Sequence, residues 1–305
     1  MSELKTLISQ ELAQPVDPRV AAFAASIAAQ YGEASRAVLF YGSCLRTTEL
    51  DGQMLDFYLI VSSYEAAYGK SWLAGANKRL PPNVFPAEHD GLVAKVAVLS
   101  EKDFHRLNRI GASAVSVWAR FAQPSRLVWQ VDEAARAKVV DAIEGAPIAL
   151  FDMTFPMMDV DTEYTIADLW KRGFELTYGA ELRAERKDRS ESVVDADPER
   201  YARFGPAVVA AIAERDKARG KHLKIAASRE AVEKRWRQLR RNGKMLTLAR
   251  LAKASSTYAG GTDYLAWKIN RHAGTDYVIK PWQRKWPILG ALVMLPRLII
   301  GGAIK

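Results

Sequence analysis

The sequence predicts an α/β (α+β) fold in which a short sheet comes first along the chain and helices follow it. Three strand-like runs, at 37–41, 54–62 and 92–100, all precede residue 130, and helical periodicity dominates from about 132 to 254. With 305 residues, 49% of them hydrophobic, the chain is long enough for a sizeable core. We therefore expect an N-terminal domain at 1–130, a helix-rich second domain at 131–215 and a basic helical tail at 216–305.

The first clear helix is predicted to begin at Pro18. Asp17 is a capping residue, and proline is favoured at the first helical position. Apolar residues then recur at helical spacing, and Gly32 closes the run; they are Val20, Phe23, Ala24, Ile27 and Ala28.

The strands define two faces of the predicted sheet. The run 37–41 (AVLFY) reads as a buried strand that ends in a turn at Gly42-Ser43. In the run 54–62, alternation gives one face to Leu55, Phe57, Leu59 and Val61 and the other to Asp56, Tyr58 and Ile60. The run 92–100 is a third strand, and a helix over 101–108 is expected behind it.

The positive charge of the chain is concentrated at its C-terminal end. The net charge is +9, but residues 214–305 carry 21 Lys and Arg against 6 Asp and Glu, whereas the preceding residues carry 23 against 29. A basic tail on an acidic body suggests an anionic partner surface, either nucleic acid or phospholipid headgroups.

The last segment favours the phospholipid surface. Trp282, Arg284, Lys285 and Trp286 precede an apolar stretch at 288–300 that Pro296 and Arg297 interrupt. This stretch is too broken for a spanning helix of ~20 residues, but tryptophan and basic side chains suit the headgroup level. A helix docked on the protein's own core is the alternative. We expect no nucleic-acid partner, because stacking aromatic residues are not interleaved with the charge.

Several other classes of site are disfavoured. A single cysteine, Cys44, excludes an internal disulfide framework and a cysteine-based zinc cluster. The four histidines show no ligand spacing. The first residues, MSELKTLISQELAQ, resemble neither a signal peptide nor a transit peptide, so we expect cytoplasmic synthesis.

The chemistry is expected where the first strand meets the second. A glycine-serine turn lets backbone N–H groups and a hydroxyl approach a triphosphate, so Gly42 and Ser43 are candidate nucleotide-binding residues. Asp56 on the neighbouring strand is a candidate ligand for Mg²⁺. Taken alone, a Gly-Ser turn is common, and an edge-strand or capping aspartate is the alternative for Asp56.

Polymerase-beta-like nucleotidyltransferases usually place two acidic residues at alternating positions on that second strand. Here the positions two before and two after Asp56 are Met54 and Tyr58. The second metal ligand is therefore expected from elsewhere. Asp51 is our first candidate, and Glu88, Asp90 and Glu101 are the others.

The stretch YGSCLRTTELDGQMLDFYLIV resembles the mitochondrial translocator assembly and maintenance family of CDP-diacylglycerol synthases, in which a YGS turn precedes a single strand aspartate. The resemblance continues in the same order through LPPNVFPAEHDGLVAKVAVLS, WARFAQPSRLV and GFELTYGAELR, over roughly residues 38–205. These segments map the family's lysine onto Lys95, its Arg-x-x-x-Pro element onto Arg120 and Pro124, and its last element onto Leu176, Thr177, Tyr178, Glu181 and Arg183. Cys44 and Thr177 are mild departures.

The resemblance implies a polymerase-beta-like nucleotidyltransferase domain, a helical second domain for which a winged helix is one arrangement, and a bacterial-type enzyme peripheral on the inner face of the cell membrane. It implies a reaction of CTP with phosphatidic acid that needs Mg²⁺. The implied roles are nucleotide binding by Tyr41, Gly42 and Ser43, catalysis by Asp56 and Lys95, metal binding by Asp56, and recognition of substrate phosphate by Arg120 and Arg183. An edge lysine is the alternative for Lys95, and solvated surface residues are the alternative for the arginines.

Two other functions fit the same residues. The enzyme could transfer the nucleotide to another lipid phosphate or to a soluble phosphate. Alternatively, the lone strand carboxylate fits a catalytically degenerate fold that serves as a membrane-binding module.

Overall fold

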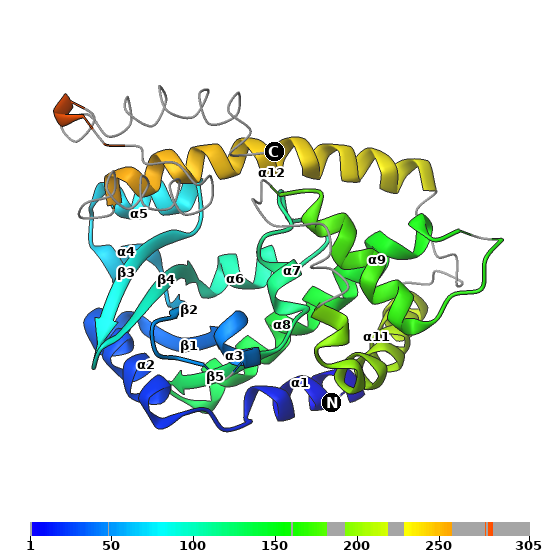
Figure 1. Cartoon of the computed structure of the whole chain (residues 1–305), viewed down its shortest axis with the longest axis horizontal. Coiled ribbons are helices and arrows are strands. Elements are labelled where there is room, and N and C mark those ends of the chain that lie inside the picture. The colour runs from blue at the N-terminus through cyan, green and yellow to red at the C-terminus, as the bar shows by residue number, and fades with distance from the viewer. Residues whose placement is uncertain are drawn as a thin grey trace.

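The structure is a computed structural model, and it describes residues 2–47, 49–159, 161–181, 193–218, 229–257, 278 and 280–282. Figure 1 shows a sheet on one side of the molecule, a group of helices on the other, and one long helix, α12 (Arg229–Thr257), that lies across both.

The sheet has five strands in the order β3-β4-β2-β1-β5. They are β1 (Ser35–Tyr41), β2 (Met54–Val61), β3 (Asn83–His89), β4 (Leu92–Ser100) and β5 (Ser125–Gln130). β2 and β4 pair in parallel, and the other neighbours are antiparallel. The mixed α/β architecture and the three predicted strands are confirmed. The two strands that sequence analysis missed, β3 and β5, are the edges, and Pro86 within β3 is tolerated there because an edge strand leaves one side unpaired.

Helix α2 (Pro18–Tyr31), which the cap and periodicity predicted, covers one face of the sheet. The Asp17 side chain accepts a hydrogen bond from the backbone N–H of Arg19, and Gly32 ends the helix at a φ of 51°. Phe23 packs edge-on against Phe57 with ring centroids 5.4 Å apart. The first core cluster therefore joins α2 to the β2 face that carries Leu55, Phe57, Leu59 and Val61.

The other face of the sheet supports a larger cluster. Tyr58 and Ile60 belong to it, so the two faces of β2 are those that alternation predicted. The helices that contribute are α1 (Glu3–Leu12), α6 (Glu101–Leu107), α7 (Trp118–Phe121), α8 (Glu133–Thr154), α9 (Ile166–Tyr178), α11 (Pro198–Ala218) and α12. The short helices are α3 (Ser43–Thr47), α4 (Tyr64–Tyr68), α5 (Trp72–Arg79) and the 3₁₀ turns η1 (Gly32–Ala34) and η2 (Phe155–Met157).

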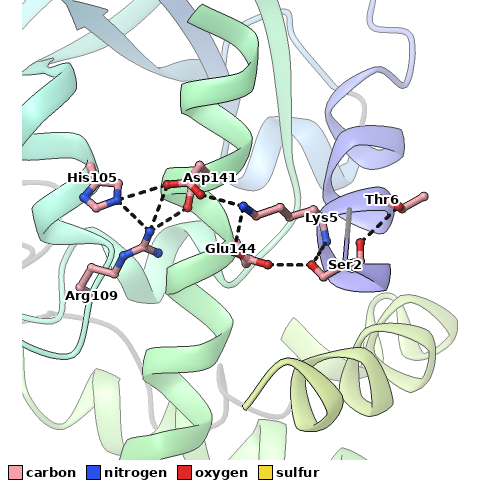
Figure 2. A network of polar contacts seen from close by, with 7 residues as sticks. All are labelled: Ser2, Lys5, Thr6, His105, Arg109, Asp141 and Glu144. Atoms are coloured by element: carbon pink, nitrogen blue, oxygen red, sulfur yellow. Dashed lines mark hydrogen bonds and ion pairs between the residues drawn. The ribbon is translucent and has the colours of Figure 1, made fainter. Parts of the chain in front are cut away.

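Helix α1 was not expected from the sequence. Its apolar residues point into the core, and polar contacts fix its outer side to α8 (Figure 2). The Lys5 ammonium lies 2.8 Å from the Asp141 carboxylate, and the Ser2 hydroxyl donates to Glu144 at 2.8 Å. On the other side of Asp141, Arg109 and His105 complete the network. Helix α1 is thus an integral part of the fold.

A buried ion pair also holds α1 against α11. The Arg200 and Glu11 side chains are 5% and 8% exposed, and Arg200 Nη2 donates to Glu11 Oε1 at 3.0 Å. Arg200 Nη1 also donates to the carbonyl of Ala122 at 3.2 Å. Because both charges are removed from water, loss of either partner would leave the other uncompensated.

Helix α12 includes the basic segment 229–244 that the sequence placed in a tail. Its apolar residues Val232, Trp236 and Leu239 are buried in the large core cluster, and Trp236 Nε1 donates to the carbonyl of Met153 at 2.8 Å. The basic residues Lys234, Arg237 and Arg241 are exposed. One core cluster therefore extends across the positions near 130 and 215 where domain boundaries were expected.

Candidate active site at the end of strand β1

Asp56 lies on β2, close to the point where β1 ends. Its partner across the antiparallel pair is Tyr41, and its partner across the parallel pair is Lys95 on β4. Side chains of directly paired residues project from the same face of a sheet. Tyr41, Asp56 and Lys95 therefore form one row on the face that also carries Tyr58.

Gly42 brings the backbone directly against Asp56. Its φ is +96°, a conformation that favours glycine, and a Cβ atom at this position would lie 2.9 Å from Asp56 Oδ2. Ser43 follows as the first residue of α3, and its side chain is exposed. The glycine-serine corner and the carboxylate at position 56 thus lie together at one end of the sheet.

Cys44 next to this corner is a buried thiol. Burial and the negative charge of Asp56 raise its pKa, and its Sγ lies 3.6 Å from the carbonyl oxygen of Met54. A raised pKa keeps the sulfur protonated and unreactive at neutral pH. This agrees with its interpretation as a small buried side chain.

Lys95 is not an edge lysine. β4 is paired on both sides, to β2 through Asp56 and to β3 through Pro86. The side chain is half-buried, and no carboxylate of the described residues lies within 4.0 Å of its ammonium. The alternative of an edge-strand lysine is therefore wrong, and Lys95 places a positive charge beside Asp56.

Arg120 lies over the tyrosine rings on this face of the sheet. Tyr41 and Tyr58 are in contact, with centroids 5.2 Å apart, and the Arg120 guanidinium carbon is 5.5 Å from the centroid of Tyr41. Burial alone would lower the pKa of Arg120, but the acidic groups around it outweigh this effect and raise the pKa above its ordinary value. Those groups are Tyr41, Tyr58, Glu181 and Asp56. Arg120 is therefore a permanent cation within electrostatic range of Asp56.

Two further cations, which sequence analysis did not select, come from α12. Arg250 Nη1 donates to the Ser116 hydroxyl at 3.1 Å, and Arg250 Nε donates to the carbonyl of Pro81 at 3.0 Å. Lys253 donates to the carbonyls of Leu80 and Pro82. Burial lowers the pKa of both side chains, that of Lys253 to about 7. Only the tertiary fold brings Arg250 within electrostatic range of Tyr58 and Arg120, because it is separated from both by more than one hundred residues.

Of the other predicted site residues, the structure describes Asp51 and Trp282. The side chain of Asp51, predicted as the second metal ligand, is 82% exposed and accepts a hydrogen bond from Arg19 Nη1, on α2, at 2.9 Å. Arg183, Arg284, Lys285 and Trp286 lie outside the described residues. Trp282 is described, and it is 42% exposed. None of the described helices combines the length and the hydropathy of a membrane-spanning segment.

Asp56 can serve as a metal ligand. Within the described residues, no three acidic, cysteine or histidine side chains form a metal-binding group, so an all-protein metal cage is not present in that part of the chain. Mg²⁺, however, is usually held by one or two carboxylates together with substrate phosphates and water. The Asp56 carboxylate fits this requirement, because it lies against Gly42 and forms no ion pair with a described residue.

No protein-family model matches the chain, and no curated protein matches it. Among solved structures, the chain is similar to a nucleotidyltransferase-like protein from Exiguobacterium sibiricum. That likeness has a TM-score of 0.28 and 11% sequence identity, and it covers 93% of this chain and 92% of the other. A likeness this distant carries no argument about function.

Proposed function

We propose that this protein is a phosphatidate cytidylyltransferase, which makes CDP-diacylglycerol and pyrophosphate from CTP and phosphatidic acid. The observation that carries the proposal is the close approach of Gly42 to the Asp56 carboxylate. The Asp56 carboxylate lies beside a bare backbone, is flanked by Lys95 and Arg120, and forms no ion pair with a described residue. Such a group suits a magnesium-bound triphosphate. The choice of CTP and phosphatidic acid comes from the sequence resemblance.

In this proposal Tyr41, Gly42 and Ser43 bind the nucleotide at the end of β1, and Asp56 holds the metal. A bound Mg²⁺ would neutralise charge on the triphosphate as pyrophosphate leaves. Lys95, one strand away from Asp56, contributes further positive charge to the same phosphates. These groups act by orientation and by charge neutralisation, as is usual for transfer at phosphorus.

The acceptor needs no strong general base. The phosphate of phosphatidic acid is already anionic at neutral pH, so its oxygen can attack the α-phosphorus of CTP as the bond to pyrophosphate breaks. Arg120 is suited to hold that acceptor phosphate, because a guanidinium presents its donors in a planar fork. Arg183 is proposed for the same task.

The proposal also requires the protein to meet its lipid at a membrane surface. Trp282, Arg284, Lys285 and Trp286 are proposed to contact the anionic headgroups, on the inner face of the cell membrane. Each basic residue near such a surface contributes about 1 kcal/mol, and the exposed basic side chains of α12 have the appropriate charge.

The test is turnover with labelled CTP, Mg²⁺ and mixed micelles of phosphatidic acid, followed as lipid-soluble cytidine label and as released pyrophosphate. Asp56→Asn is expected to lose at least about 100-fold in rate, because a charged group that stabilises the transition state is removed. Asp51→Asn is the matched control, since its exposed carboxylate pairs with Arg19 on α2. No turnover with any lipid phosphate would refute the proposal, and near wild-type activity of Asp56→Asn would remove Asp56 from the mechanism.

A further inference from the structure

Two guanidinium groups from distant parts of the chain converge on Ser116. Arg120, on α7, donates from Nη1 to the Ser116 carbonyl at 3.0 Å, and Arg250, on α12, donates from Nη1 to the Ser116 hydroxyl at 3.1 Å. Both arginines lie within electrostatic range of Tyr58, two residues after Asp56 on the same face of β2. Residues two apart on a strand are separated by roughly 7 Å.

The positive charge of this pair is not compensated by ion pairs. Each guanidinium is half-buried, and among the described residues no carboxylate lies within 4.0 Å of either one. In hydrogen bonds to described residues, Arg120 uses one of its five N–H donors and Arg250 uses two. Of the described carboxylates, that of Glu181 lies within electrostatic range of both cations but forms no ion pair with either. Two like charges brought together in a partly buried place repel each other, and a dianion between them would relieve that repulsion.

The position of Arg250 is fixed by the packing of α12. Asn242 donates to the carbonyl of Ser113 at 3.3 Å, and a Cβ atom at Gly243 would lie 2.0 Å from the carbonyl oxygen of Ala180. The helix therefore lies in close contact with the chain just after α9, about two turns before Arg250. A cation held by such packing keeps its place before any ligand arrives.

We infer that Arg120 and Arg250 together bind the phosphate monoester of the acceptor, so that α12 supplies part of the substrate site. The inference rests on the proposed function and deepens it. Arg120 lies over Tyr41 and within electrostatic range of Asp56, so a phosphate bound by the pair would lie close to the corner assigned to the triphosphate. The ligand class is a phosphate monoester dianion, either the headgroup of a lipid or a free phosphate.

The test compares Arg250→Gln with Arg240→Gln, an exposed arginine on the same helix. We expect Arg250→Gln to raise the KM for soluble dihexanoyl phosphatidic acid roughly tenfold or more, since a charge-assisted hydrogen bond is lost. The KM for CTP is expected to stay within about twofold in both variants. Glycerol 3-phosphate and inorganic phosphate serve as alternative ligands. Comparison with them shows whether the dianion that the pair binds belongs to a lipid headgroup or is a free phosphate.

A second readout needs no turnover. Dihexanoyl phosphatidic acid or inorganic phosphate, without CTP, is expected to raise the Tm of the wild-type protein and of Arg240→Gln, but not that of Arg250→Gln. If the wild type turns over no acceptor while this pattern holds, the proposed function fails and the phosphate pair stands. If the wild type is active and Arg250→Gln changes neither the acceptor KM nor the Tm response, the inference is wrong. A rise in the KM for CTP instead would also overturn it.

Loss of folding can be told apart from loss of binding. Arg120→Lys keeps the charge and removes the planar fork, and we expect it to weaken acceptor binding while the protein unfolds at the wild-type temperature. Unchanged acceptor binding in Arg120→Lys would count against the pair.

Discussion

Replacement of Gly42 by alanine is the sharpest test of the site. The residue has a φ of +96°, outside the regions that residues with a Cβ occupy readily, and the added Cβ would lie 2.9 Å from Asp56 Oδ2. The backbone strain is expected to cost about 1–3 kcal/mol of stability. For a chain of this size or somewhat smaller, each kcal/mol lowers Tm by roughly 2–4 °C.

The loss of activity should exceed the loss of stability. The Asp56 carboxylate must move away from the new methyl group, and a displacement on the order of 1 Å in a reacting geometry costs about 100-fold in rate. We therefore expect Gly42→Ala to fold, to melt several degrees lower than the wild type, and to lose about 10- to 100-fold in cytidylyl transfer.

Gly52→Ala is the matched control. Gly52 also has a positive φ, +68°, but a Cβ there would have no atom within 4 Å. It should lose about 1–2 kcal/mol from the backbone alone and keep its activity. Thermal unfolding gives the stability of both variants, and initial rates below their melting range give the activity. Equal loss of activity in the two variants, or full activity in Gly42→Ala, would refute the argument that Gly42 makes room for Asp56.

Three further results are expected. Gly243→Ala should lower the free energy of unfolding by about 1–3 kcal/mol, because its Cβ would overlap the Ala180 carbonyl. Thermal unfolding measures this change, and unchanged stability would show that α12 is not closely packed there. Glu11→Ala should cost about 3–5 kcal/mol, because the Arg200 charge stays buried without a partner; a loss below 1 kcal/mol, on the order of an exposed pair, would contradict this. Burial lowers the pKa of Lys253 to about 7, so this side chain loses its charge as the pH increases from about 6 to 8.5. An anion bound beside Lys253 favours the protonated form. The rise in Tm that sulfate causes should therefore weaken as the pH increases over this range. Sulfate does not titrate in this range, and Lys253→Gln should abolish the pH dependence; a pH-independent sulfate effect in the wild type would show that Lys253 does not face the anion.

Strands with a clear local sequence pattern were predicted correctly, and strands with a weak pattern were missed. The strand over β2 was predicted together with its two faces, because alternation with period two specifies which side chains share a face. The edge strands β3 and β5 were missed: β3 contains Pro86, and the outer residues of an edge strand are too exposed to give a clear pattern. Helix α1 was missed although Leu4, Leu7, Ile8 and Leu12 recur at helical spacing, a signal that was available.

The sequence by itself determined the strand-turn-strand unit that carries Gly42, Ser43 and Asp56, since short-range periodicity and turn chemistry act between residues close along the chain. It also determined that the C-terminal part is basic. The tertiary structure decided which charges gather around Asp56: it directed Asp51 to Arg19 and brought Arg250 to Arg120. The physical reason is that burial of the apolar side of α12 fixes where its cations lie, and this packing depends on residues from the whole chain.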